Sequence, residues 1–116
     1  MQLVVRGLLN RNIDAFFANP DNTVFAAFET ILNNCDKNGV PVFTSEVGLV
    51  KRGAVAAYGA DIYQWGYQAG EMAANFLKKG KDADLKVEEV KNRKRVYNGE
   101  VAKRYGFKFD NSFERL

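Results

Sequence analysis

The stretch "NPDNTVFAAFETILNNC", residues 19–35, decides the fold class because it changes abruptly from turn-forming residues to a helical pattern. Its apolar side chains recur at intervals of three and four residues, at Val24, Ala27, Phe28, Ile31, Leu32 and Cys35. This spacing predicts an α-helix with one buried face. Asp21 and Asn22 are candidate N-caps, and Gly39 followed by Pro41 marks the end of the helix.

Short apolar segments flank this helix. Residues 12–18, "NIDAFFA", form a nearly continuous apolar run, which is typical of a strand covered on both faces of a parallel sheet. The segments "VPVFTS", residues 40–45, and "GAVAAYG", residues 53–59, predict two further strands. Strands and helices that alternate at this spacing indicate parallel βαβ units.

The rest of the chain supplies more helices and strands. Residues 2–11 predict a short helix, and residues 62–79 predict a long one that ends at Gly80. The apolar stripe of the long helix consists of Ile62, Trp65, Ala69, Met72, Ala73, Phe76 and Leu77. Residues 84–98 predict one or two edge strands, and residues 99–105 a short helix ended by Gly106. We therefore expect an α/β fold, with a parallel sheet and flanking helices, as one domain over residues 1–116.

Composition excludes several classes of protein. The chain has 116 residues, no histidine and one cysteine, so the commonest general base and the usual zinc ligands are missing. We interpret Cys35 as a core residue. No apolar run approaches the roughly 18 residues of a membrane span. No phosphate-binding glycine motif and no catalytic constellation is present, so we expect a protein without enzymatic activity or a cofactor.

The net charge of +3 includes one dense basic run, "KNRKR", residues 91–95. Such a run is able to bind a phosphate backbone or an anionic membrane surface. Acidic residues precede it, at Glu88 and Glu89, and no aromatic residues that would stack on bases are interleaved with it. We therefore interpret it as a solvated strand or turn and expect no nucleic-acid partner.

Polar residues follow each of the three predicted strands, where ligands bind in open parallel sheets. A helix start offers free N–H groups to a carboxylate, acidic side chains pair with an ammonium group, and tyrosines form an aromatic wall. An amino acid or similar zwitterion would use all three kinds of group. The candidate ligand-binding residues are Asp21, Asn22, Thr23, Ser45, Glu46, Tyr58, Asp61 and Tyr63.

Each of these residues also has a purely structural interpretation. Asp21 and Asn22 are good caps without any ligand, and Asp61 is able to serve only as the cap of the long helix. Ser45 and Glu46 suit a plain turn. An aromatic residue on a helical stripe, such as Trp65, is more often a core residue than part of a ligand site.

The order of several segments resembles a known family. The matching segments are "DAFFANPDNTV", "VPVFTSE", "VKRGAVAAYGADIYQWGYQAGEMAANFLKKG" and "VYNGEVAKRYGF". They are similar to the carboxy-terminal part of ABC-transporter substrate-binding proteins of the tryptophan/tyrosine-type group, which have the type I periplasmic-binding-protein fold. The resemblance runs from about residue 2 to about residue 109. Glu46 departs from the pattern, because the family more usually has aspartate there.

The resemblance implies a solute-binding component of an ABC importer, with a permease as its partner and an extracytoplasmic location for the full-length form. No signal peptide is recognisable in this chain, and the family's amino-terminal lobe is absent, so we expect a truncated form. The helix at residues 62–79 would then be exposed and would drive the formation of a homo-oligomer. The alternative is the ligand-sensing effector domain of a transcription regulator, which has the same fold.

Overall fold

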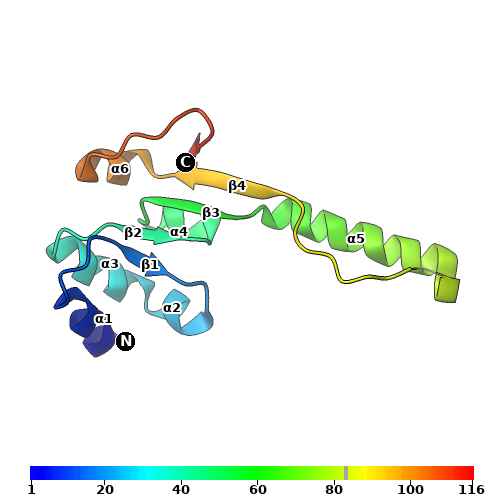
Figure 1. Cartoon of the computed structure of the whole chain (residues 1–116), viewed down its shortest axis with the longest axis horizontal. Helices are drawn as coiled ribbons and strands as arrows, with labels where there is room; N and C mark the ends of the chain where they lie inside the picture. Colours follow the sequence, from blue (N-terminus) through cyan, green and yellow to red (C-terminus); the bar gives the residue numbers. More distant parts are fainter. Residues whose placement is uncertain (83) are drawn as a thin grey trace. The chain divides into compact units, whose positions relative to one another are not determined.

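The computed structural model describes residues 1–82 and 84–116 and divides into two compact units (Figure 1). Unit 1 comprises Met1–Gly59 and Lys94–Leu116, and unit 2 comprises Ala60–Arg93. The prediction that residues 1–116 form one domain stays a prediction.

Within the described residues, unit 1 is built on a five-stranded sheet with the order β1-β2-β3-β4-β5. The strands are β1 (Phe16–Ala18), β2 (Val42–Thr44), β3 (Ala56–Ala60), β4 (Arg93–Tyr97) and β5 (Glu114–Arg115). The first three run parallel, with Phe17 opposite Phe43 and Thr44 opposite Ala57. The backbone N–H of Asn98, just after β4, donates to the carbonyl of Val55, just before β3, so β4 runs against β3. The predicted parallel βαβ arrangement is therefore confirmed for β1 to β3.

Helices pack against one face of this sheet, over β1 to β4. They are α1 (Gln2–Leu9), α3 (Phe28–Lys37) and α4 (Val47–Lys51), whereas α2 (Asn22–Ala26) follows β1. The main core between these helices and the sheet consists of Val5, Leu9, Ala18, Phe28, Ile31, Cys35, Val40, Val42, Leu49, Val50, Ala54, Ala57 and Val96. Every strand from β1 to β4 thus contributes a buried side chain to this face, and the prediction that Cys35 is a core residue is confirmed.

The second face of the sheet is covered by α6 (Gly99–Tyr105) and the chain that follows it. Ala102 of α6 packs with Val55 and Ala56, and Phe109 and Phe113 pack against this small cluster. The aromatic side chains interlock further, because the ring of Phe109 stacks on Tyr97 with 4.7 Å between the centroids. This second cluster lies over β3 and β4 and reaches β2, where Phe43 packs against it and its ring centroid lies 5.5 Å from that of Phe107.

The prediction for residues 12–18 is wrong in two respects. Only Phe16–Ala18 forms a strand, and Phe17 is 59% exposed, so β1 is covered on one face rather than on both. The continuous apolar run encodes side chains for both faces, but the described chain supplies helices for only one of them at this strand.

Three further elements differ from the sequence-based expectation. The helix after β1 is interrupted at Ala27, where φ is −104° and ψ is 10°, and forms α2 and α3 instead of one element. The five-residue helix α4 was not predicted. Neither was β5, and β4 is therefore not an edge strand.

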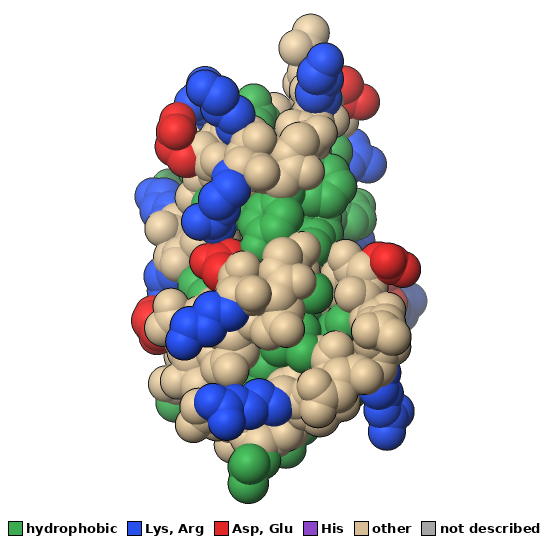
Figure 2. Space-filling view, turned by 90° about the vertical axis from the view of Figure 1, so that its left-hand side faces the viewer, with side chains coloured by type: hydrophobic (Ala, Val, Ile, Leu, Met, Phe, Trp, Pro, Cys, Tyr) green, Lys and Arg blue, Asp and Glu red, His purple; other side chains and the backbone are tan. Residues whose placement is uncertain are grey.

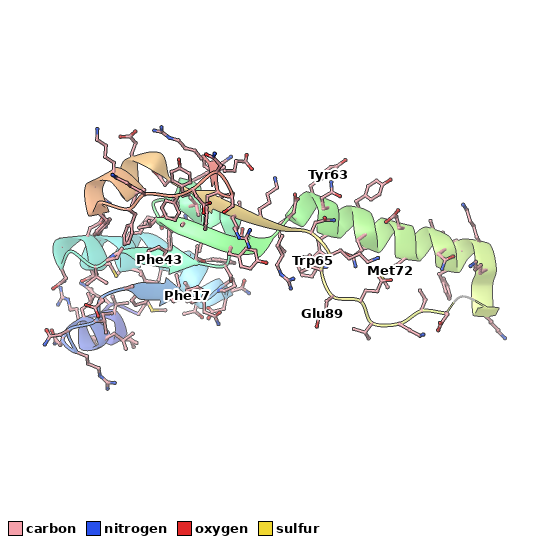
Figure 3. The ribbon with its side chains drawn as sticks, turned by 45° about the horizontal axis from the view of Figure 1, so that its top comes forward. Phe17, Phe43, Tyr63, Trp65, Met72 and Glu89 are labelled. Atoms are coloured by element: carbon pink, nitrogen blue, oxygen red, sulfur yellow. The ribbon has the colours of Figure 1, made fainter. Side chains whose placement is uncertain are left out.

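Unit 2 contains α5 (Ile62–Lys79), a 3-10 turn (Gly80–Asp82) and an extended segment over residues 84–92 without strand structure. The bounds of α5 are those predicted. Gln68 is buried on α5, where its amide donates to the Glu88 carboxylate and the Glu89 carbonyl and accepts from the N–H of Lys91. Trp65 and Met72 point toward this extended segment, whereas Tyr63 points away (Figure 3).

Most of the apolar stripe on α5 is exposed. Trp65 is 50% exposed, Phe76 48% and Leu77 82%, and only Met72 of the larger side chains is half-buried. Trp65 is therefore not a core residue of this chain. Of the described helices, none is long and apolar enough to cross a membrane.

Figure 2 shows one face of the surface, on which hydrophobic side chains lie in the middle and charged side chains around them. Lys and Arg side chains are spread over this face among Asp and Glu side chains. They are not gathered into the single stripe that a duplex-binding surface usually presents.

Candidate functional site

The carboxyl ends of β1 and β2 are joined by one buried threonine. The hydroxyl of Thr44, the last residue of β2, donates to the carbonyl oxygen of Ala18 at the end of β1 over 2.9 Å. The same hydroxyl accepts from the backbone N–H of Glu46 at 3.1 Å. The segments that leave these two strands are thereby fixed beside each other, as expected for neighbouring parallel strands.

The carboxyl ends of β2 and β3 are in direct contact. Gly59 is buried, and a side chain there would overlap the carbonyl oxygen of Ser45. Only a glycine permits this close approach of the two backbones. The structure thus brings the first residue after β2 against the carboxyl end of β3.

Two predicted acidic residues begin the helices that follow these strands. Oδ1 of Asp21 accepts from the N–H of Val24 at 2.9 Å, and Oε1 of Glu46 accepts from the N–H of Gly48 at 2.9 Å. Both carboxylates are therefore N-caps, and the capping interpretation of Asp21 is confirmed. Asn22 and Thr23 are exposed in the first turn of α2.

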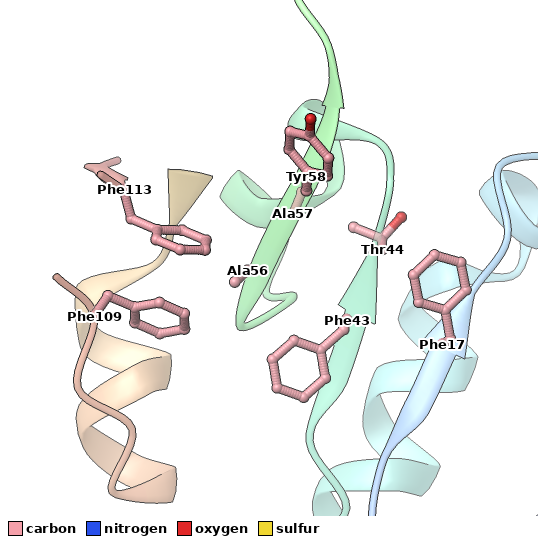
Figure 4. A pocket seen from close by; sticks show the side chains of 8 residues that line it. All are labelled: Phe17, Phe43, Thr44, Ala56, Ala57, Tyr58, Phe109 and Phe113. Carbon is pink, nitrogen blue, oxygen red and sulfur yellow. The ribbon is translucent and has the colours of Figure 1, made fainter. Parts of the chain in front are cut away.

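Tyr58 directly precedes Gly59 in β3. Its ring stands on the second face of the sheet and is 53% exposed, with the guanidinium of Arg95 5.1 Å from the ring centroid. It lines an apolar cavity of about 260 Å³ (Figure 4). The other residues that line the cavity are Phe17, Phe43, Thr44, Ala56, Ala57, Phe109 and Phe113.

Sequence reasoning did not single out this cavity. Its aromatic side chains come from four separate segments, and only the register of β1 against β2 places Phe17 beside Phe43. The available signal was the alternation around "DAFFA" and "PVFT", in which the central phenylalanine of each strand points away from the main core.

Asp61 and Tyr63 belong to unit 2. Oδ1 of Asp61 accepts from the N–H of Gln64 at 3.2 Å, so Asp61 caps α5. Its backbone N–H donates to the carbonyl of Asn92. Tyr63 is 77% exposed. Whether these two residues share a site with those of unit 1 stays a prediction.

A third polar cluster ties α6 to α3. The hydroxyl of Tyr105 donates to Oδ1 of Asp36 over 2.7 Å, and Arg104 forms an ion pair with the same carboxylate. Burial, and then the hydrogen bond to Asp36, raise the pKa of Tyr105 to about 12. Burial likewise raises the pKa of the neighbouring Cys35 thiol to about 11. These groups hold two elements together, and a thiol kept protonated in this way is a poor nucleophile.

The residues that the structure describes contain no group of three or more side chains suited to a metal ion. The chemistry available at the ends of β1 to β3 is that of hydrogen bonding. It consists of carboxylates, amides, hydroxyls and the N–H groups of the loops, as a reversible binding site requires.

Comparison with known proteins identifies the family. The model of the ABC transporter substrate binding protein family matches residues 1–114, which is nearly the whole chain. This chain therefore belongs to that family, as the resemblance implied.

One curated relative is the tyrosine-binding protein of Clostridioides difficile (strain R20291). The chain is 29% identical to it over 91 residues, which cover 78% of this chain and 26% of that protein. This chain thus spans about a quarter of the relative's length.

Solved structures agree with this assignment. The chain is similar to a conserved domain protein from Vibrio cholerae O1 biovar El Tor str. N16961, with a TM-score of 0.78 and 29% identity over 96% of this chain and 37% of that one. It is also similar to an ABC domain in complex with L-Trp from Streptococcus pneumonia, with a TM-score of 0.76 and 26% identity over 96% of this chain and 38% of that one. The α/β fold of periplasmic binding proteins is thereby confirmed.

Proposed function

We propose that this chain supplies part of the solute site of an ABC importer, and that the solute is an aromatic amino acid or a related small zwitterion. The observation that carries the proposal is the Thr44 junction, which holds the polar segments after β1 and β2 at one edge of the sheet. The relatives named for tyrosine binding and for a complex with L-Trp support an aromatic solute.

The candidate residues divide by chemistry. Asn22, Thr23 and Ser45 offer hydrogen bonds to the carboxylate of the solute, together with backbone N–H groups. Asp21 and Glu46 are N-caps, and a carboxylate oxygen not used in the cap is suited to the ammonium group. We include Tyr58, Asp61 and Tyr63 in the proposed site because of their positions in the sequence. The tyrosines supply aromatic groups and Asp61 supplies an acidic one.

Isothermal titration calorimetry with tyrosine, tryptophan and leucine tests the proposal. We expect heat with the two aromatic amino acids, and about a tenfold weaker affinity for Asn22→Ala and for Ser45→Ala, because each change removes a hydrogen bond to a charged group. Asn33→Ala, an exposed amide on α3, is the control and leaves the affinity unchanged. Absence of heat with all three amino acids would contradict the proposal.

The other roles follow from the family and are also proposals. The chain acts without catalysis, delivers its solute to an ABC permease and works outside the cytoplasm. The effector domain of a transcription regulator, the alternative considered from sequence, has no relative among the proteins reported above. Retention of the chain on DNA, lost at high salt, would be required to revive that alternative.

Self-association through α5 is the last proposal of this kind. The exposed side chains of Trp65, Phe76 and Leu77 support it, because a large apolar surface in water favours association.

A further inference from the structure

A single arginine side chain connects the helices that follow β1 and β2. Arg52 caps the end of α4, and its guanidinium reaches the junction of α2 and α3. There Nη2 donates to the carbonyl of Phe25 over 3.1 Å, and Nε and Nη2 donate to the carboxylate of Glu29 over 3.0 and 2.8 Å. Arg52 therefore bridges two segments that begin at the carboxyl ends of neighbouring strands.

Helix α2 depends on contacts of this kind, because it has only five residues and none of them is buried. A helix this short is not stable in water by itself. The carboxylate of Asp21 fixes its first turn, and its larger apolar side chains are only partly buried against the main core. The hydrogen bond from Arg52 fixes its last turn. Since α2 carries Asn22 and Thr23 of the proposed solute site, its placement decides where these two side chains lie.

The guanidinium of Arg52 is itself held in place. Its Cζ lies 5.1 Å from the ring centroid of Phe28, which is fully buried in the main core. A guanidinium presents several donors in one rigid plane, so it binds both oxygens of Glu29 and the carbonyl of Phe25 together. A lysine at this position would supply the charge without this geometry. Exposed ion pairs contribute little to the stability of a whole chain, so the local placement of α2 is the main effect of the contact.

We propose that Arg52 is a positioning residue of the solute site, whose guanidinium ties α2 to α4 so that Asn22 and Thr23 stay beside the carboxyl end of β2. Side chains that bind a ligand need a rigid support, because a small displacement removes their hydrogen bonds. Arg52 acts through the backbone of α2 and does not itself contact the solute. The inference rests on the proposed function, since it concerns the same site.

Hydrogen exchange tests the placement of α2 without any solute. The N–H of Val24, which donates to Asp21 at the start of α2, reports the opening of this helix. We expect Arg52→Ala to lower its protection by about tenfold more than it lowers that of the Cys35 amide in α3, because α2 loses a hydrogen bond to a charged group. Lys51→Ala, which removes an exposed charge at the preceding position, is the matched control and leaves both amides unchanged.

Isothermal titration calorimetry with tryptophan tests the link to the solute site. We expect Arg52→Ala to weaken the affinity by about tenfold, and Arg52→Lys to weaken it almost as much, because lysine retains the charge but not the planar donors. The double change Arg52→Ala and Asn22→Ala is expected to bind little more weakly than Arg52→Ala alone, since the arginine acts through the helix that carries Asn22. Lys51→Ala is expected to bind as the unchanged chain does.

Failure of the proposed function and failure of this inference give different results. An unchanged chain that gives no heat contradicts the proposed function, whereas the exchange at Val24 still shows whether Arg52 places α2. Equal losses of protection at Val24 and Cys35, full affinity in Arg52→Lys, or additive losses in the double variant would each overturn the inference. Should Arg52→Ala not fold, Glu29→Gln takes its place in the exchange measurement and is expected to give a smaller loss at Val24, because it weakens the ion pair and retains the contact with Phe25.

Discussion

At Gly59 the backbone of β3 lies against the Ser45 carbonyl, so a substitution there tests the contact between the carboxyl ends of β2 and β3. We expect Gly59→Ala to lower the free energy of unfolding by about 1–3 kcal/mol, because the backbone of the Ser45 loop has to move. Urea unfolding followed by circular dichroism measures the change. Gly7→Ala is the control, since the added methyl group meets no other element of the chain within 4 Å and alanine favours the α1 helix. An equal stability of Gly59→Ala and the unchanged protein would contradict the close packing.

At Tyr105 the ionisation of the side chain is linked to stability. Its pKa is about 12 in the folded chain against an ordinary value of 10.0, so the folded state holds the phenolic proton more tightly than the unfolded state. The contribution of Tyr105 to the free energy of unfolding is complete below pH 10 and is lost as the pH rises toward 12. Urea unfolding at several alkaline pH values is expected to show this fall. Tyr105→Phe is expected to show a smaller one.

The Cys35 thiol also links stability to pH, over a range that begins lower than that of Tyr105 and overlaps it. Its pKa is raised from 9.0 to about 11 in the folded chain, so its contribution falls between those values. Cys35→Ala therefore serves as the control for Tyr105→Phe, because it removes the earlier part of the fall and retains the later part. A Tyr105→Phe variant with an unchanged alkaline profile would show that the burial of Tyr105 and its hydrogen bond to Asp36 do not link stability to pH.

Among the elements, α5 and its extended segment depend on the amide of Gln68. We expect Gln68→Ala to cost unit 2 about 1–3 kcal/mol of local stability, because the N–H of Lys91 loses its acceptor and the Glu89 carbonyl loses a donor. Hydrogen exchange at the Lys91 amide measures the release of the segment. Gln64→Ala, earlier in the same helix, is the control. Unchanged protection at Lys91 would show that the segment is held by other contacts.

The elements that were predicted correctly carry their own boundary signals. Asp61 and Gly80 delimit α5, and Asn98 and Gly106 delimit α6, through side-chain capping and positive φ angles that depend on nearby residues only. The elements that were missed lack such information. Helix α4 has five residues, too few for a periodic pattern, and β5 has two, which form a strand only because β4 lies beside them.

For the chain as a whole, the ends of β1 to β3 could be predicted from the sequence, but which side chains would be buried or exposed could not. Polar residues after parallel strands meet at one edge by topology, which made Asp21, Ser45 and Glu46 predictable as neighbours of strand ends. The apolar cavity was not predictable in this way, because the exposure of Phe17 depends on which helices the chain supplies to each face. A continuous apolar run indicates that both faces of the sheet are covered at that strand. It does not indicate which elements cover them.

Self-association is the prediction that belongs to the molecule as a whole. We expect the chain to form a homo-oligomer whose mass in light scattering rises with concentration, because Phe76 and Leu77 on α5 expose apolar surface that two copies would bury together. The double change Phe76→Ser and Leu77→Ser is expected to shift the equilibrium toward monomer by at least about tenfold, since each large side chain contributes on the order of 1.5–3 kcal/mol when buried. Leu3→Ser on α1 removes a similarly exposed leucine outside α5 and is expected to leave the mass unchanged. A chain that stays monomeric at every concentration would rule out association through α5, and a loss of association only with Phe17→Ser would place the contact on the sheet instead.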